Sequence, residues 1–413
     1  GVPTLANPAT VARDEVVCCD TSVDGPVQRL ADGRVAFRAR VPGLGLAPAV
    51  AVAVPTAERV VVTDRTMTNG LLAVAWDPDG NLRSVIDVTH RRELLPVGAL
   101  GAVLELAPDR PVRYDAWDLE SWVRDDPERL LTAEHVEVVE TGPLVGMVRV
   151  QRSFGPSAAT LTYVLRAGSP RLDVEIELDW HHREHLLSLA FPLDVHADQA
   201  TCGIQFGAVR RPTHPSSPWD AAKFEVCAHR YVDVAEPSFG VAVLNDGRYG
   251  HHVFGGGVRV SLARGARYPD PDADQGRHAV TISLLPHGPG LADVVAEAER
   301  LDLPVRIVIG RAERAPAPVV SVTGTGIEVD AVKVADDGSG DLIVRLHEAC
   351  GDRVPVTVAA DRRILAASRC NLLEEPLGAY EVSDGIVATT LRPFELLTLR
   401  LTRAAATDPA ALG

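Results

Sequence analysis

Residues 171–180 read RLDVEIELDW and show the clearest period of two in this chain. Apolar side chains occupy every second position from Leu172 to Trp180, and acidic side chains fill the positions between them. Successive side chains of a β-strand point to opposite faces of a sheet. The pattern therefore predicts a strand with one buried face and one face toward water or a ligand.

The same signals continue on both sides of this stretch. Residues 147–154 and 159–165 flank the turn formers Gly155-Pro156-Ser157, and residues 77–81 (DPDGN) carry the Asp-Gly pair of a tight hairpin turn. Many strands with Gly and Pro turns, and one helix at residues 291–301, predict an all-β fold built as a large antiparallel sandwich.

The length of 413 residues exceeds one ordinary domain, so we expect a division into several units. Residues 1–62 are predicted to form a small β domain and residues 63–290 a β-supersandwich. The helix at 291–301 marks a boundary, and residues 291–403 form a C-terminal β-sandwich. Residues 404–413 are a small, polar tail.

Composition excludes several classes of partner. The net charge of −15 argues against nucleic acid and against anionic membranes. No apolar run of about 18 residues is present, so no transmembrane helix is predicted. The six cysteines include no C-x-x-C pair, which favours reduced thiols and a cytoplasmic location.

A first candidate binding segment is Tyr114-Asp115-Ala116-Trp117-Asp118. The Trp117 ring can stack on a sugar face, and Asp115 and Asp118 can accept hydrogen bonds from hydroxyl groups. The structural alternative is a loop in which Trp117 and Trp122 fill the sandwich.

A second candidate lies in residues 203–252, where residues 212–219 contain three prolines and two serines and are predicted to form a loop. The candidate side chains there are Arg210, Arg211, His214, Trp219 and Asp220. A guanidinium group binds two oxygens at once, which suits a polar ligand such as a sugar. The alternatives are an ordinary polar loop and salt bridges to the many nearby acids.

Two histidine motifs are weak candidates for a metal. His181-His182-Arg-Glu-His185 follows a strand, where four residues span about 13 Å, too far for two ligands of one zinc ion. His196-Ala-Asp198 offers two ligands, and nothing in the sequence supplies the others. We therefore predict no metal site in this chain.

Several ordered pieces resemble the C-terminal β region of glycoside hydrolase family 38, the retaining α-mannosidases, and the cytosolic branch most of all. Tyr114–Asp118 belongs to these pieces, and the resemblance is firmest over residues 69–288. The downstream pieces are Arg211-Pro-Thr-His214, Trp219-Asp220, Lys223-Phe-Glu-Val226, Ala228-His-Arg230, Leu244-Asn-Asp246 and Tyr249-Gly-His251.

The resemblance implies a β-supersandwich of the galactose mutarotase type. In this family a separate N-terminal α/β barrel carries the nucleophile and zinc or another divalent metal, so no catalytic residue and no cofactor is expected in this chain. The implied partners are that barrel and a mannose-containing oligosaccharide, with homo-oligomers of the full-length enzyme. Tyr114 is implied to reach the active site of the barrel, and Arg210 or Arg211 to close over substrate.

Two other functions remain open. A non-catalytic carbohydrate-binding module would use Trp117, Trp122 and Trp219 as its aromatic platform. A mutarotase-like aldose epimerase would need a carboxylate facing His214 or His229. A retaining glycosidase in this chain itself would need two carboxyl groups about 5–5.5 Å apart. The available carboxyl groups are those of Asp115, Asp118, Asp220 and Glu225, and their spacing singles out no pair.

Overall fold

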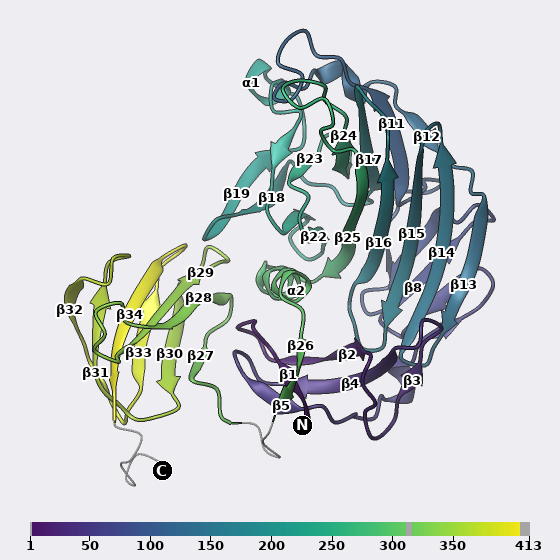
Figure 1. Ribbon diagram of the computed structural model, residues 1–413. Coiled ribbons are helices and arrows are strands. Elements are labelled where there is room, and N and C mark those ends of the chain that lie inside the picture. The colour runs from purple at the N-terminus through teal and green to yellow at the C-terminus, as the bar shows by residue number, and fades with distance from the viewer. Residues whose placement is uncertain (1, 311–315, 405–413) are drawn as a thin grey trace.

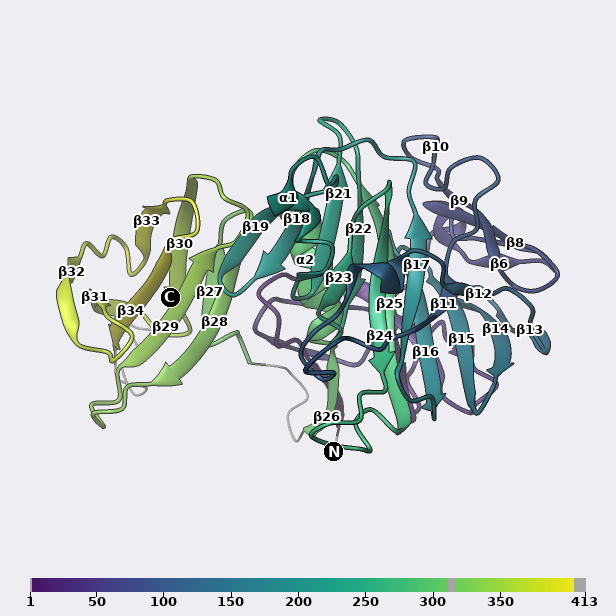
Figure 2. The ribbon, with the colours of Figure 1, turned by 90° about the horizontal axis from the view of Figure 1, so that it is seen from above.

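The computed structural model describes residues 2–310 and 316–404. Within them almost every regular element is a β-strand, and all the paired strands run antiparallel (Figures 1 and 2). The predicted all-β class with a supersandwich is confirmed. The described part of the chain contains no helix long and apolar enough to cross a membrane.

The largest sheet has nine strands, and the alternating stretch at residues 171–180 forms its fourth strand, β16 (Leu172–Trp180). Its alternation is realised, because Leu172, Val174 and Ile176 are buried in the main core. The full order is β13 (His135–Thr141), β14 (Val145–Phe154), β15 (Ser157–Arg166), β16, β25 (Gly276–His287), β22 (Gly240–Asn245), β21 (Tyr231–Ala235), β18 (Gln199–Ile204) and β19 (Gly207–Pro212).

Two further sheets complete the supersandwich. The six-stranded sheet is β12 (Glu128–Leu130), β11 (Val103–Pro108), β17 (His185–Pro192), β24 (Gly257–Arg264), β23 (Gly250–His252) and β20 (Val226–Cys227). The five-stranded sheet is β10 (Arg92–Glu93), β9 (Leu82–Asp87), β8 (Leu72–Trp76), β7 (Thr66–Thr68) and β6 (Val61–Val62). One continuous hydrophobic core joins all three sheets.

The N-terminal unit consists of two three-stranded sheets. One is β26 (Arg306–Gly310), β1 (Val2–Ala6) and β5 (Leu46–Pro48), and the other is β2 (Arg13–Cys19), β4 (Val35–Val41) and β3 (Gln28–Arg29). Two strands lie elsewhere than predicted. β26 pairs with β1 and not with the C-terminal sandwich, and β6 pairs with β7 of the supersandwich. The sequence of a short strand does not indicate which strand it pairs with, so sequence order alone placed these two strands in the wrong unit. The predicted domain boundaries stay a prediction.

The long helix forms where expected, as α2 (Ala292–Asp302). Its buried face, with Val294, Val295 and Ala298, packs on the nine-stranded sheet against Ala242 and Leu285. The remaining helical turns are η1 (Thr56–Glu58), η2 (Ser121–Arg124) and α1 (Pro218–Ala221). The helix therefore covers one part of the supersandwich and stands between it and the C-terminal sandwich (Figure 1).

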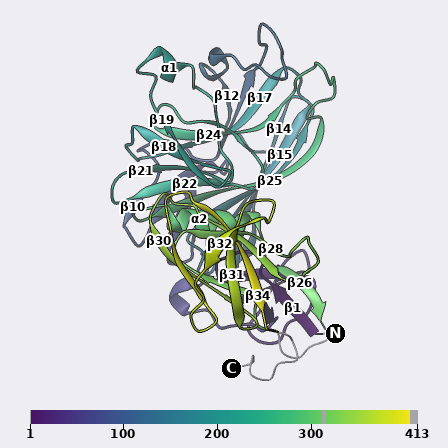
Figure 3. The ribbon, with the colours of Figure 1, turned by 90° about the vertical axis from the view of Figure 1, so that its left-hand side faces the viewer.

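The C-terminal sandwich has its own hydrophobic core, separate from that of the supersandwich. Figure 3 views the molecule from the side of this sandwich, with its strands in front. Its sheets are β27 (Val320–Thr323), β30 (Val354–Ala360) and β33 (Val387–Leu391), facing β28 (Ile327–Val334), β29 (Leu342–Glu348), β34 (Leu396–Arg403), β31 (Ile364–Cys370) and β32 (Pro376–Tyr380). Of the predicted tail, residues 405–413 lie outside the described residues.

A buried charge cluster joins this sandwich to the supersandwich. Arg230 donates from both terminal nitrogens to the Glu328 carboxylate, at 2.7 and 2.6 Å. His347 lies 3.3 Å from the same carboxylate and 3.0 Å from that of Asp330. The tip of the β18–β19 hairpin closes the joint, since Phe206 meets the His347 ring edge-on at 5.6 Å.

Candidate functional site

The loop that carries Tyr114 has a defined shape. Tyr114 adopts a left-handed backbone with φ of +53°, which is unusual for a bulky residue, and its carbonyl accepts the N–H groups of Trp117 and Asp118, both at 2.8 Å. The Asp115 carboxylate accepts the N–H groups of Arg267 at 2.7 Å and Tyr268 at 3.2 Å. These bonds tie the loop to the neighbouring connection between β24 and β25.

The far end of the same loop is also anchored. The Arg264 guanidinium donates to the carbonyl of Asp118 and forms an ion pair with the buried carboxylate of Asp109. Tyr114 and Trp117 remain 63% and 65% exposed, and their rings meet edge-on at 6.5 Å. Trp122 is 50% exposed, so the alternative in which Trp117 and Trp122 fill the sandwich is wrong.

The arginine pair lies on β19, where neighbouring side chains point to opposite faces. Arg210 is exposed and Arg211 is half-buried. Neither forms an ion pair with any residue that the structure describes. Arg211 Nε and His214 Nδ1 are buried and have no hydrogen-bond partner in the described chain. Most buried polar atoms in proteins have a hydrogen-bond partner, so these two atoms retain bonding capacity.

Trp219 and Asp220 lie on the single-turn helix α1. Ser217 caps this turn, because its Oγ accepts the N–H of Asp220 at 3.1 Å and donates to the Asp220 carboxylate at 2.7 Å. The cap engages Asp220 and directs Trp219 outward, where it is 82% exposed.

One ion pair holds the two candidate segments together. Arg124 of η2 donates from Nε to Glu225, just after α1, at 2.6 Å. Its other nitrogens reach Ser188 Oγ at 2.6 Å and Ser261 Oγ at 3.2 Å on the six-stranded sheet. Burial raises the pKa of Glu225, although Arg124 opposes that shift. Figure 1 accordingly shows α1 and the blue loop together at the top of the molecule.

This end of the molecule exposes several large rings, which we call the aromatic rim. Its members come from three separate connections of the chain. They are Tyr114, Trp117, Trp122, Trp219 and Tyr268. Sequence reasoning missed Tyr268 and Arg124, because the contacts that bring them here join residues 101 to 153 positions apart. Whether the predicted site residues bind a ligand stays a prediction.

The described residues do not fit a zinc site. They contain no group of three or more His, Cys, Asp or Glu side chains placed to hold a metal ion. Residues 181–184 connect β16 to β17, so the predicted polar turn between strands is confirmed, and His185 begins β17. The His182 ring stacks on Phe154 at 5.5 Å and hydrogen-bonds with Ser157 Oγ at 2.8 Å.

The arrangement required for an aldose epimerase is also not found. Among the described residues neither His214 nor His229 contacts a carboxylate, and the His229 ring lies 4.7 Å from that of Tyr249. Of the carboxyl candidates, Glu225 is paired with Arg124, Asp115 with backbone N–H groups and Asp220 with its cap. These groups hold the loops in place, which is a structural task.

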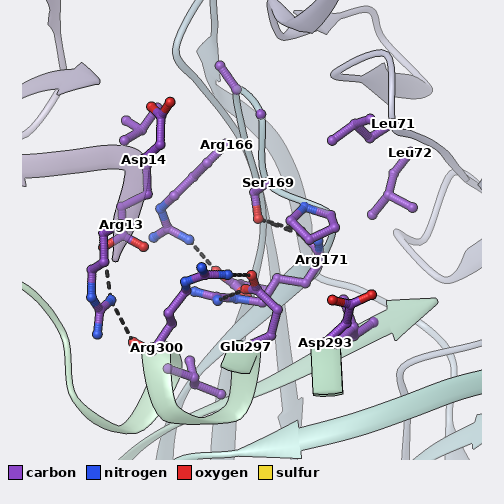
Figure 4. A pocket seen from close by; sticks show the side chains of 18 of the residues that line it. Arg13, Asp14, Leu71, Leu72, Arg166, Ser169, Arg171, Asp293, Glu297 and Arg300 are labelled. Carbon is purple, nitrogen blue, oxygen red and sulfur yellow. Dashed lines mark hydrogen bonds and ion pairs between the residues drawn. The ribbon is translucent and has the colours of Figure 1, made fainter. Parts of the chain in front are cut away.

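A large cavity lies away from the aromatic rim. It has a volume of about 970 Å³ and runs between β2, the connection at residues 166–171 and α2 (Figure 4). Arg171 bridges Asp173 at 2.8 Å and Glu297 at 2.6 Å, while Arg166 pairs with Asp173 and Arg300 with Glu297. Burial alone would raise the pKa of Asp173, but its two arginines outweigh burial and lower that pKa.

The three sheets and their shared core define an all-β protein whose central unit is a β-supersandwich. Residues 67–272 match the glycosyl hydrolases family 38 C-terminal domain, and residues 326–399 match the glycosyl hydrolases family 38 C-terminal beta sandwich domain. The chain belongs to glycosyl hydrolase family 38, of which it carries the C-terminal region.

Curated relatives agree with this assignment. The chain is 34% identical over 346 residues to alpha-mannosidase 2C1 of Homo sapiens and 30% identical over 356 residues to alpha-mannosidase G of Dictyostelium discoideum. These alignments cover 81% and 82% of this chain but only 33% and 32% of the relatives. The chain thus spans about a third of the length of the curated relatives it matches.

A solved structure supports the fold. An alpha-mannosidase from Enterococcus faecalis V583 superposes with a TM-score of 0.73 over 97% of this chain and 51% of that protein. Their sequence identity is 17%, so this likeness speaks for the architecture alone.

Proposed function

We propose that this chain is the C-terminal region of a retaining α-mannosidase and that its aromatic rim completes the sugar pocket of a metal-dependent catalytic domain. The full enzyme would hydrolyse terminal α-mannosides in the cytosol, as a homo-oligomer. The observation that carries the proposal is the Tyr114 loop. The rings of Tyr114 and Trp117 lie on an anchored loop of this family 38 C-terminal region and face outward. They are not buried in the core of the chain.

The rim residues divide into two kinds. Tyr114 and Trp117 offer ring faces that stack on the apolar side of a sugar. Arg210 and Arg211 offer guanidinium groups with no ion-pair partner among the described residues, suited to hydroxyl or carboxylate oxygens. Asp115 acts through the loop that it anchors, because its carboxylate is occupied by two N–H groups.

The metal belongs to the catalytic domain in this proposal. Zinc or another divalent ion there would supply Lewis-acid chemistry, and this chain would supply positioning and exclusion of water. The partners are therefore the catalytic domain of the same polypeptide and a mannose-containing oligosaccharide.

A carbohydrate-binding module is the second candidate, favoured by the exposure of Trp117, Trp122 and Trp219. Stacking platforms of this kind bind sugars without catalysis. Under this reading the isolated chain binds mannosides by itself, and the loss of one tryptophan abolishes that binding.

The test is hydrolysis of a chromogenic α-mannoside by this chain alone and by a longer polypeptide that includes the catalytic domain, each with and without zinc or cobalt. We expect turnover only in the longer polypeptide. Tyr114→Ala should lower kcat/KM by about 100-fold, the scale on which lost positioning acts. Arg210→Ala and Arg211→Ala, assayed separately, identify the arginine that meets substrate.

Arg34→Ala is the matched control, because Arg34 lies in the N-terminal unit with 43% of its side chain exposed, and its ion pair among the described residues is with Asp32. It should leave kcat/KM unchanged. Turnover by the 413-residue chain alone, or full activity of the Tyr114 variant, would refute the proposal.

A further inference from the structure

The large cavity follows the edge of a strand. Every residue from Ala12 to Cys18 lines it, although alternate side chains of a strand point to opposite faces. A cavity that touches all of them must run along the side of the strand. The sheet order β2-β4-β3 makes β2 an edge strand, so its unpaired side faces the cavity.

Hydrogen-bond geometry shows which backbone groups face this cavity. The N–H of Val52 donates to the carbonyl of Arg38 at 2.8 Å, so the peptide groups of Arg38 point away from β2. Arg38 lies opposite Val16. In an antiparallel pair both residues of a non-bonded position turn their N–H and C=O outward. Val16 therefore directs both groups into the cavity.

The alternation extends this result along β2. Asp14 and Cys18 share the orientation of Val16, whereas Glu15 and Val17 bond to β4. Ala12 has the same orientation, and its carbonyl accepts Arg300 of α2 at 3.1 Å. Beyond Ala12, the outward backbone groups of Asp14, Val16 and Cys18 have no protein partner in the described chain.

The charged side chains around the cavity are largely paired with one another. Arg166, Arg171 and Arg300 are held by Asp173, Glu175 and Glu297, as Figure 4 shows for the labelled residues. Arg13 pairs with Glu15, and Arg40 with Asp14. The groups that still lack hydrogen-bond partners are thus the outward backbone N–H and C=O groups of β2. An added β-strand would supply those partners.

We propose that the free edge of β2 is the docking strand for an extended segment of the catalytic region of the same polypeptide. This inference rests on the proposed function, which requires such a region. The family relatives are about three times as long as the part matched here, so they contain the necessary chain.

Amide hydrogen exchange at residue resolution tests the proposal. In the 413-residue chain we expect the amides of Asp14, Val16 and Cys18 to exchange at least about tenfold faster than those of Glu15 and Val17, which serve as internal controls. In the longer polypeptide the three outward amides should become protected to the level of their neighbours. Equal exchange of the three amides in both proteins would overturn the proposal.

A matched pair of variants gives an independent test. Val16→Pro removes the outward N–H without touching the β2–β4 bonds, and proline is tolerated on that side of an edge strand. Val16→Ala loses the same apolar contacts but keeps the N–H. In the longer polypeptide, the amides of Asp14 and Cys18 should exchange at least about tenfold faster in the proline variant than in the alanine variant. Equal exchange of these amides in the two variants would contradict the docking strand.

The remaining outcomes separate the two proposals. Hydrolysis by the longer polypeptide without protection of the three amides leaves the proposed function standing and removes the docking strand. Protection of the three amides in the longer polypeptide without hydrolysis would support the docking strand and remove the proposed function. Protection that grows with the concentration of the 413-residue chain alone would assign the edge to a second copy and overturn the proposal.

Discussion

The supersandwich meets its two neighbours in different ways. Toward the C-terminal sandwich, Arg230 and Glu328 form a bidentate pair, and Phe206 closes on His347. Toward the N-terminal unit, the charged side chains are also paired, but a cavity of about 970 Å³ remains. The edge of β2 that faces this cavity has no partner strand among the described residues. The first joint is complete within this chain, and the second has room for another segment.

The difference shows that paired side chains do not by themselves complete an interface. Buried backbone groups need partners as much as buried charges do. Mutations at the closed joint should therefore act on the stability of this chain, whereas mutations at the open joint and the aromatic rim should act on its partner and substrate.

The largest effect should come from Arg230→Met at the closed joint. It leaves the buried Glu328 carboxylate without its main partner, which costs about 3 kcal/mol. Calorimetry and amide exchange over residues 327–348 should show a loosened C-terminal sandwich. Arg34→Gln, which breaks an exposed pair with Asp32, should cost under about 1 kcal/mol. Equal losses in the two variants would mean that the buried pair does not hold the joint.

Gly207→Ala should weaken the same joint by about 1–3 kcal/mol. An added Cβ would lie 2.6 Å from the Phe394 ring, at a backbone φ of +151°. Gly247→Ala is the control, because Gly247 has φ of +156° and no neighbouring atom within 4 Å. Denaturant unfolding should show the larger loss at Gly207, and Phe394→Leu should restore part of it. Similar losses at both glycines would attribute the effect to backbone strain alone.

The closed joint should also depend on pH. Burial lowers the pKa of His347, but Asp330 and Glu328 outweigh burial and raise it to about 9. A raised pKa stabilises the folded state fully below the unfolded value of about 6.5, and the contribution is lost as pH rises through 9. At about 1.4 kcal/mol per pKa unit, the loss is at most about 3 kcal/mol.

Thermal unfolding between pH 6 and 10, with NMR titration of the His347 ring, measures this dependence. His347→Gln should flatten the alkaline part of the profile. A His347 ring with a pKa near the ordinary histidine value would show that Asp330 and Glu328 do not stabilise the joint through its charge.

The smallest effect on stability is expected at the aromatic rim. Tyr114→Ala and Trp219→Ala remove exposed rings, so each should change the unfolding free energy by less than about 0.5 kcal/mol. Denaturant unfolding of the 413-residue chain provides the measurement. A loss above about 1 kcal/mol in either variant would mean that the ring supports the fold and is not held out for a ligand.

Much of the architecture was predictable from local patterns. The alternation at 171–180, the hairpin at 77–81 and the helix at 291–301 are confirmed as β16, the β8–β9 turn and α2. The candidate site could be predicted from the sequence only in part. Tyr114 and Trp117 are outward as the binding hypothesis requires, but their exposure depends on Asp115 and Arg264 bonding to distant segments.

The sequence by itself determined the all-β class and which faces are apolar, because strand periodicity and turn chemistry are local properties of the chain. It also pointed to the family, through the ordered pieces between Tyr114 and His251. Only the tertiary structure decided that β26 joins the N-terminal sheet, that Arg124 meets Glu225, and that β2 keeps a free edge. Each of these depends on contacts between segments far apart in the chain, which side-chain periodicity does not record.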